Sequence, residues 1–206
     1  TELQMKALEK NGMPLVLVDR YFPELKVNYV TIDNLGAAFA GVNHLVETGC
    51  QRIGLIAFKT DLLHLQDRKL GYLQALKKGK IAVSKSLIKE VAIDETTQQE
   101  VEVAINELLR LPGGIDALFF TSNKVATYGL QYLNKHKVAV PKKVKVLNFD
   151  QSDAAELFYV PLTHVRQPMQ QMGKGAVRIL IENINGNKKI IQLQLHAELV
   201  LAQSTQ

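Results

Sequence analysis

The stretch KVKVLNFDQSDAAELFYVPLTHVRQPMQQMGKGAV, residues 143–177, decides the fold expected for this chain. An apolar run at 144–149 ends in the acidic residue Asp150, and a second run at 163–166 leads into a segment with helical periodicity. Short apolar runs without polar alternation are typical of strands buried on both faces of a parallel sheet. The stretch therefore predicts a buried strand that ends at a ligand-binding residue, followed by a strand and helix that form a hinge.

The alternation of strand and helix continues over the rest of the chain. Apolar runs predict strands at 14–19, 27–32, 52–58, 88–93, 115–121, 144–149, 163–166 and 190–201. Helical periodicity predicts helices that start near residues 3, 35, 67, 97, 123 and 168, with Asn34 as a cap and 59–65 as a loop. This order predicts an α/β fold with parallel, doubly wound sheets.

Composition limits the possible classes of protein. The chain has 206 residues, of which 47% are apolar, so it can bury the core of one domain or of two small lobes. The net charge of +5 comes from scattered lysine pairs, which favours a solvated surface over a nucleic-acid footprint. Cys50 has no cysteine partner in the chain, and no apolar run approaches the length of a membrane span. We expect a cytoplasmic protein without a membrane segment.

Catalytic and metal-binding motifs are not evident. The sequence has no G-x-S-x-G, Walker or G-x-G-x-x-G motif, and its five histidines lie apart from one another without Cys or Glu at ligand spacing. Cys50 has no general base at a recognisable spacing. We therefore expect no catalytic residue, no metal site and no cofactor, and predict that the chain is not an enzyme.

Polar side chains follow several of the predicted strands, where parallel α/β sheets bind their ligands. They are Asp19 and Arg20, Asp33, residues 121–123, and Asp150. Each residue alone is also typical of a helix cap or a turn. Together they offer acceptors and an amide suited to the hydroxyl groups of a sugar, and Arg68 adds planar donors or is a surface arginine. The pattern favours a binding protein.

Six groups of motifs occur in an order and spacing that cover essentially the entire chain. They are VTIDN at 30–34 with GVNHLVETGCQRIGLI at 41–56, DRKLGYLQAL at 67–76, residues 121–130, residues 146–150, PLTHVRQPMQQMG at 161–173 and HAELVLAQST at 196–205. This set resembles the LacI/GalR family of bacterial transcriptional repressors. We found no helix-turn-helix pattern, so the resemblance is to the effector-binding part of such a repressor, truncated at its N-terminus.

The resemblance implies a two-lobed, periplasmic-binding-protein-like fold. Residues 1–32 and 165–188 would form a partial N-terminal lobe, and residues 33–164 and 189–206 the C-terminal lobe, with the DNA-binding headpiece absent from this sequence. The implied function is a regulatory domain of a homodimeric repressor that binds a sugar or sugar-derived effector between the lobes and alters operator affinity allosterically. The alternative is a soluble sugar-binding protein of a transport system.

The family motifs also imply roles for individual residues. Effector-binding residues would be Arg20, Asp33, Arg68, Asn123 and Asp150, and the crossover between lobes would contain Arg166, Gln167 and Pro168.

Two positions depart from the family pattern. Lys124 stands where Asp is usual, and Asn148 stands where Gly is usual. With Arg20 and Arg68 expected nearby, the charge of Lys124 leads us to expect an acidic effector, such as a uronate or a sugar phosphate.

Overall fold

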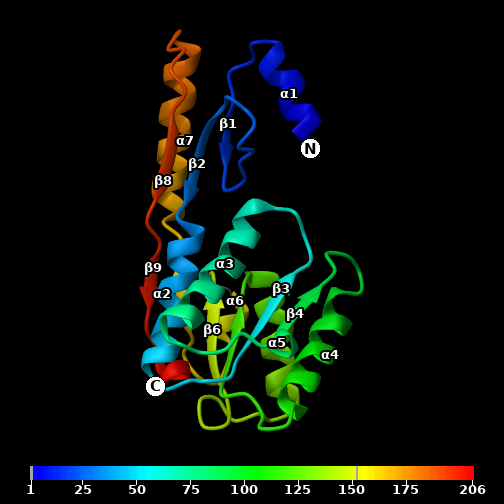
Figure 1. Cartoon of the computed structure of the whole chain (residues 1–206). Helices are drawn as coiled ribbons and strands as arrows, with labels where there is room; N and C mark the ends of the chain where they lie inside the picture. Colours follow the sequence, from blue (N-terminus) through cyan, green and yellow to red (C-terminus); the bar gives the residue numbers. More distant parts are fainter. Residues whose placement is uncertain (1, 152) are drawn as a thin grey trace.

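The computed structural model describes residues 2–151 and 153–206, in which strands and helices alternate as predicted (Figure 1). Residue 1, which the sequence assigns to the first lobe, lies outside the described residues. The helices are α1 (Glu2–Lys10), α2 (Asn34–Glu47), α3 (Leu63–Lys78), α4 (Thr97–Arg110), α5 (Asn123–Lys135), α6 (Asp153–Glu156) and α7 (Met169–Ile184). The strands are β1 (Val16–Val18), β2 (Asn28–Ile32), β3 (Ile53–Phe58), β4 (Ile88–Val91), β5 (Ala117–Phe120), β6 (Lys145–Phe149), β7 (Thr163–Arg166), β8 (Gln192–Leu195) and β9 (Glu198–Val200).

The strands form two separate sheets. The small sheet has the order β1-β2-β8 and is parallel throughout. The large sheet has the order β4-β3-β5-β6-β7-β9, and only its β7–β9 pair is antiparallel. Figure 1 shows the small sheet with α1 and α7 in the upper part of the molecule and the large sheet with most of the helices in the lower part. The α/β fold with parallel-rich sheets is confirmed.

The C-terminal extended segment differs from the prediction. Instead of one segment that belongs with the large sheet, it is divided: β8 pairs with β2 of the small sheet, and β9 pairs with β7 of the large sheet. The buried β2 needs a hydrogen-bonding neighbour on each side, and β1 supplies only one of them. Residues 192–195 therefore lie in the small sheet, although the predicted lobe boundary at 189 placed them in the other lobe.

Helices cover both faces of the large sheet. On one face, Leu118 and Phe120 of β5 join the apolar cluster that contains residues of α4 and α5. On the other face, Ala117 and Phe119 join a cluster with residues of α2 and α3. This alternation explains why the strands of a doubly wound sheet are apolar at every position. Gly71 permits the close packing of α3 on α2, because a Cβ there would lie 2.4 Å from a backbone oxygen of α2.

Several local predictions were wrong for identifiable reasons. The side chain of Asp33, rather than that of Asn34, caps α2 by accepting from the backbone N–H of Gly36. Helix α3 begins at Leu63, within the predicted loop, and Leu62 gives no side-chain capping signal. Strand β1 is only partly buried, with Val18 44% exposed. Helix α6 was not predicted. Over the described residues, no helix combines the length and apolar character that crossing a membrane requires.

Candidate ligand-binding cleft

The buried guanidinium of Arg68 is the centre of a polar cluster where the two sheets meet. Arg68 is 2% exposed; its Nε donates to Asn34 Oδ1 at 2.8 Å and its Nη1 to the carbonyl oxygen of Thr121 at 2.9 Å. Nη1 also lies 3.5 Å from Asp150 Oδ2, and the guanidinium stacks 3.7 Å from the ring centroid of Phe149. Burial lowers the pKa of Arg68, and the charge of Asp150 opposes that shift. Because arginine stays charged even so, the cluster has a fixed cation at its base.

Asp150 joins Arg68 to the crossover that follows β7. Its Oδ1 accepts a hydrogen bond of 2.5 Å from Gln167 Nε2. The backbone of Asp150 has φ 78°, in the left-handed region that residues other than glycine rarely occupy. Strained positions of this kind gather at ligand sites, where the surrounding structure holds them in place. The same carboxylate thus contacts both the predicted effector residue and the predicted hinge residue.

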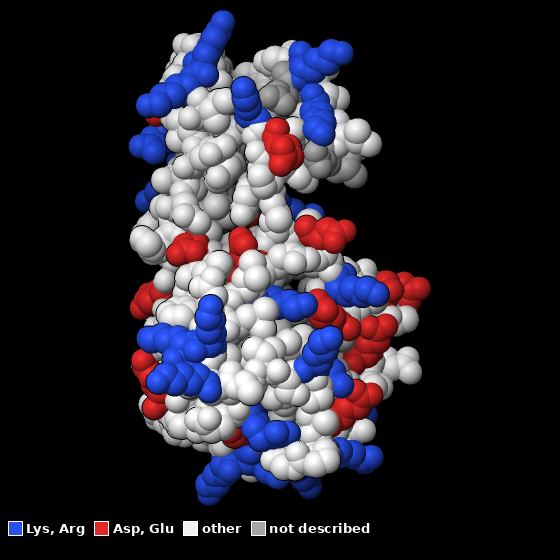
Figure 2. Space-filling view, in the orientation of Figure 1, with Lys and Arg blue, Asp and Glu red and all other residues white. Residues whose placement is uncertain are grey.

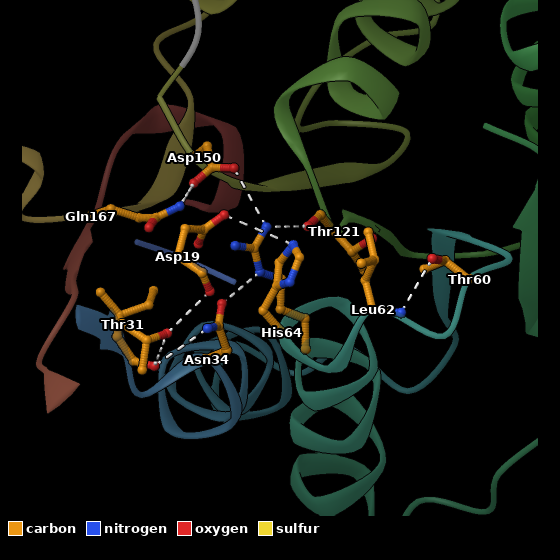
Figure 3. Close-up of polar contacts among 11 residues, drawn as sticks. Asp19, Thr31, Asn34, Thr60, Leu62, His64, Thr121, Asp150 and Gln167 are labelled. Atoms are coloured by element: carbon orange, nitrogen blue, oxygen red, sulfur yellow. Dashed lines mark hydrogen bonds and ion pairs between the residues drawn. The ribbon is translucent and has the colours of Figure 1, made fainter. Parts of the chain in front are cut away.

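Asp19 brings a second carboxylate to the cluster from the small sheet. It follows β1 with φ 67°, and its Oδ2 lies 3.9 Å from Nε2 of His64 in α3. Its Oδ1 is buried and has no hydrogen-bond partner. His64 is 7% exposed, and burial lowers its pKa, while the carboxylate of Asp19 opposes the shift. Figure 3 shows Asp19 and His64 facing each other, with Asp150 and Gln167 drawn on the same side as Asp19, away from His64.

A second contact between the two parts of the chain lies beside the Asp19–His64 pair. The hydroxyl of Tyr21 donates to Asp67 Oδ2 of α3 at 3.2 Å. Burial raises the pKa of both side chains, and the nearby Asp67 raises that of Tyr21 further. The connection from β1 to β2 therefore touches α3 at two successive turns of the helix.

Two hollows adjoin this cluster at the carboxyl edge of the large sheet. The first, of about 440 Å³, is lined by residues 20–24 and 60–64. The second, of about 490 Å³, is lined by Asn123, Asp150, Gln151, Glu156, Arg166, Gln167 and Met169. Figure 2 shows the surface hollowed between the upper and lower parts of the molecule, with lysines and arginines scattered over the face in view. Volumes of this size suit small-molecule ligands.

The structure brings the predicted effector residues together only in part. Arg68 and Asp150 lie in contact, Arg20 lines the first hollow and Asn123 lines the second. The carboxylate of Asp33 lies instead against the start of α2, where Oδ1 accepts from Gly36 N at 2.8 Å.

The predicted crossover residues run from the last residue of β7 to the N-cap of α7. Gln167 bonds to Asp150, and Arg166 pairs with Glu198 at 2.6 Å. Pro168 is the N-cap of α7, so the helix begins at Met169, one residue after the predicted start.

Lys124 is not among the residues that line either hollow. Lys124 is exposed and its charge acts on Asp94, whose pKa is lowered first by hydrogen bonds from Thr96 and then by Lys124. Asp94 precedes α4 and is not among the residues that line either hollow. The reasoning that led from Lys124 to an acidic effector therefore loses its main support.

Sequence reasoning assigned no site role to His64, Asn34, Tyr21 or Gln167's contact with Asp150. His64 lay in a segment without periodicity, and Asn34 was interpreted as a helix cap. One signal was present: a histidine and an arginine four residues apart share one face of a helix. That face is the one that α3 directs at the ends of the strands.

The chemistry of the cleft is that of binding. It contains carboxylates, amides, an imidazole and a guanidinium. Its Tyr21 hydroxyl donates to Asp67, but burial and the charge of Asp67 raise the pKa of Tyr21, which makes that hydroxyl a poor nucleophile. Burial raises the pKa of the Cys50 thiol, which makes it a poor nucleophile. Across residues 2–151 and 153–206 there is no group of three or more His, Cys, Asp or Glu side chains that could hold a metal ion.

Two sheets joined by crossovers, with a polar cleft between them, define a ligand-binding protein of the two-lobed type. A family model described as a periplasmic binding protein-like domain matches residues 42–205. The chain therefore belongs to the family of periplasmic binding protein-like domains. Solved regulators of the LacI family share its fold, and its homologues are repressors of that family, which confirms the resemblance found in the sequence.

Individual relatives narrow this comparison. The chain is 33% identical over 178 residues to the HTH-type transcriptional repressor CytR of Escherichia coli K12, covering 86% of this chain and 51% of that protein. It is 32% identical over 200 residues to the HTH-type transcriptional regulator CelR of Thermobifida fusca, covering 96% of this chain and 58% of that protein. A solved complex of CelR with cellobiose has a TM-score of 0.86 and 30% identity, covering 97% of this chain and 61% of that one. The chain thus spans about half the length of the curated relatives that it matches.

Proposed function

We propose that this chain is the effector-binding part of a bacterial transcriptional repressor. A sugar or sugar derivative would bind between the two sheets and change the affinity of the whole protein for operator DNA. The observation that carries the proposal is the polar cluster in which Asp19, which follows β1 of the small sheet, lies 3.9 Å from His64 of α3, on the helix that also holds Arg68 against Asp150. The relatives named as HTH-type regulators and the cellobiose complex of CelR support it.

The proposed lobes follow the sequence-based division, adjusted for β7 and β8. Residues up to 32 and from 167 to about 195 would form the N-terminal lobe, and the remainder the C-terminal lobe. The boundary predicted at 165 moves because β7, which ends at Arg166, pairs with β6 and β9 of the large sheet. The support is that β8 pairs with β2, while β9 returns to the large sheet. The chain then passes between the lobes after β2, after β7 and after β8, and Arg166, Gln167 and Pro168 belong to the second passage.

The proposed contacts with the effector come from residues on both sides of the cleft. Arg68 and Asp150 hold the ligand from the C-terminal lobe, and Arg20 and Asn123 lie at the two hollows. Asp33 lies at the first passage between the lobes, where its side chain caps the start of α2. We keep it in the proposal as a residue that borders the cleft. The effector moves the lobes only through its different affinity for their two arrangements.

The remaining parts of the proposal concern the whole protein. Helix-turn-helix proteins read two half-sites as dimers, which supports a homodimer that binds operator DNA in the cytoplasm. The effector in this proposal is a neutral sugar, a uronate or a sugar phosphate.

Calorimetry on the purified chain with cellobiose and ribose tests the proposal. We expect at least one of them to bind, Arg68→Met to weaken binding at least 100-fold, and the neighbouring Lys69→Met to leave it unchanged. The test continues with the full-length protein and its upstream DNA, where the bound sugar should change the DNA affinity. A sugar that binds tightly without any effect on DNA binding would favour a transport protein instead, and the absence of binding by any sugar would refute the proposal.

A further inference from the structure

Lysine pairs that lie apart in the sequence gather at one edge of the large sheet. Four connections lead from a helix to the next parallel strand, and each reaches the amino end of that strand, at the edge opposite to the cleft. They are residues 47–53, 77–88, 110–117 and 135–145, here called the amino-edge surface. The backbone N–H of Lys145 donates to the oxygen of Asp116 at 2.9 Å, and that of Asp116 to the oxygen of Arg52 at 3.0 Å. Figure 1 draws β6 pointing toward the small sheet, so the amino-edge surface faces away from that sheet.

The amino-edge surface is strongly basic. Its four connections contain eleven lysines and arginines against two acidic residues, Glu47 and Asp116, which gives a formal charge of +9 where the whole chain has +5. Figure 2 shows mainly basic side chains at the lower end of the molecule. Among residues 2–151 and 153–206, the ion pairs of lysine and arginine all lie outside this surface. Unpaired like charges repel one another, so an anionic partner would relieve this repulsion.

Only part of this charge has a structural explanation. Basic residues in the last turn of a helix offset its macrodipole, and α3, α4 and α5 have such residues. Arg52 donates to the carbonyl oxygens of Gly114 and Pro112 at 2.6 and 3.0 Å, and so holds the turn before β5. The remaining six lysines lie beyond the helix ends, and all but the half-buried Lys145 are exposed. Neither the helix dipoles nor the turn accounts for them.

The composition of the amino-edge surface indicates the kind of partner. Nine of its eleven basic residues are lysine, and it contains no Phe, Tyr, Trp or Met. Protein interfaces are enriched in aromatic residues, Met and Arg and are depleted in Lys, which disfavours a protein partner. Single-stranded nucleic acids bind by stacking on aromatic side chains, which this surface lacks. Lysine point charges alone suit the phosphates of a duplex, whose contacts do not read the sequence.

We propose that the amino-edge surface binds the phosphate backbone of duplex DNA without reading its sequence. This contact is separate from the effector cleft, which lies at the opposite edge of the sheet, and from the operator recognition that the proposed function assigns to a headpiece outside this sequence. The choice of DNA rests on the proposed function, because a protein held at an operator meets the neighbouring duplex at a high effective concentration.

Fluorescence anisotropy of the 206-residue chain with two labelled duplexes, equal in length and unrelated in sequence, tests this inference. Both should bind equally well, and the affinity should fall about 100-fold between 50 and 200 mM KCl if about four phosphates are neutralised. Lys142→Gln with Lys143→Gln should weaken binding at least tenfold at 50 mM KCl and reduce the salt slope by about 2. Lys188→Gln with Lys189→Gln is the matched control: it removes the same charge between α7 and β8, and should change neither quantity.

Lys77→Gln with Lys85→Gln repeats the loss of charge on another connection, in case the first pair of substitutions alters the fold. Equal losses from these pairs and from the control pair would overturn the inference, because binding would then follow net charge alone. A preference for one duplex sequence would overturn it as well, and so would poly-L-glutamate that displaces the duplex at an equal concentration of charge, which would indicate an acidic protein partner. Failure to bind either duplex would overturn the inference and leave the proposed function intact, since sugar calorimetry tests that separately.

Discussion

Replacing Arg68 by methionine should destabilise the fold more than any other single change to a charged side chain in α3. Methionine keeps the length of the side chain and a high helix propensity, so the loss measures the guanidinium itself. Arg68 is 2% exposed and bonds to Asn34 and to the carbonyl of Thr121, with Asp150 at 3.5 Å. Removing one member of a buried ionic network leaves the other unpaired, which costs about 3–5 kcal/mol.

The neighbouring residue offers a matched control. Lys69 pairs with Glu90 at 2.9 Å, but the two side chains are 30% and 38% exposed. An exposed pair of this kind contributes about 0–1 kcal/mol, so Lys69→Met should leave the unfolding free energy almost unchanged. Urea denaturation followed by circular dichroism measures both, and equal m-values would show that the variants unfold from comparable states.

A double variant separates two contributions to the loss of unfolding free energy: the hydrogen bonds of Arg68, and the charge of Asp150 that is left without a cation. In Arg68→Met with Asp150→Asn, the amide at 150 no longer needs a cation, so the double variant should be more stable than Arg68→Met alone by about 1 kcal/mol. Asparagine tolerates the left-handed backbone of Asp150. A loss below 1 kcal/mol for Arg68→Met, or one no larger than that for Lys69→Met, would refute the reasoning.

Three further predictions test the packing and electrostatics of α3 and α7. The unfolding free energy should fall as the pH drops from 7.5 to 5.5, because burial lowers the pKa of His64 in the folded chain and protons therefore favour the unfolded chain. The fall should begin near pH 6.5, the ordinary pKa of histidine. His64→Gln should reduce the dependence of the unfolding free energy on pH, and an unchanged dependence would contradict the prediction. Gly71→Ala should cost at least about 1–3 kcal/mol in urea denaturation, because its Cβ would lie 2.4 Å from the oxygen of Leu35. Gly173→Ala in α7, where nothing lies within 4 Å, should stabilise the chain by up to about 1 kcal/mol, and a loss there would show that the helix is not as described.

The parts of the fold that could be predicted from sequence are those that depend on local periodicity. Strands β3, β5 and β6 were predicted because a strand covered on both faces is apolar at every position. Asp150 and Arg68 were predicted to lie together with less direct support, from the rule that ligands bind at the carboxyl ends of parallel strands and from the family motifs. Local periodicity and the rule for strand ends both describe residues of a single sheet, and neither gives the position of one sheet relative to the other.

The remaining features depend on the arrangement of the two sheets, which local periodicity does not record. The pairing of Asp19 with His64 requires the end of β1 to face α3, and the sequence contains no pattern for that angle. The division at residues 196–197 was missed because neither glycine nor proline interrupts the extended segment there. The start of α3 was missed because the buried His64 and Leu65 lie side by side in its first turn, which hides the helical period.

Under the proposed function, the contacts of Asp150 would connect ligand binding with movement of the lobes. One carboxylate oxygen faces Arg68, and the other holds Gln167, which begins the passage from β7 to α7. Helix α7 packs on β1 and β2. Under the proposed function, an effector that bonds to Asp150 would change the strength of the Gln167 contact and, through it, the position of α7. By linkage, whatever shifts α7 must change the affinity for the effector by the same factor. Gln167→Ala should therefore weaken the coupling between sugar and DNA in the full-length protein more than Arg166→Ala, whose pair with Glu198 is exposed, and equal coupling in the two variants would contradict this connection.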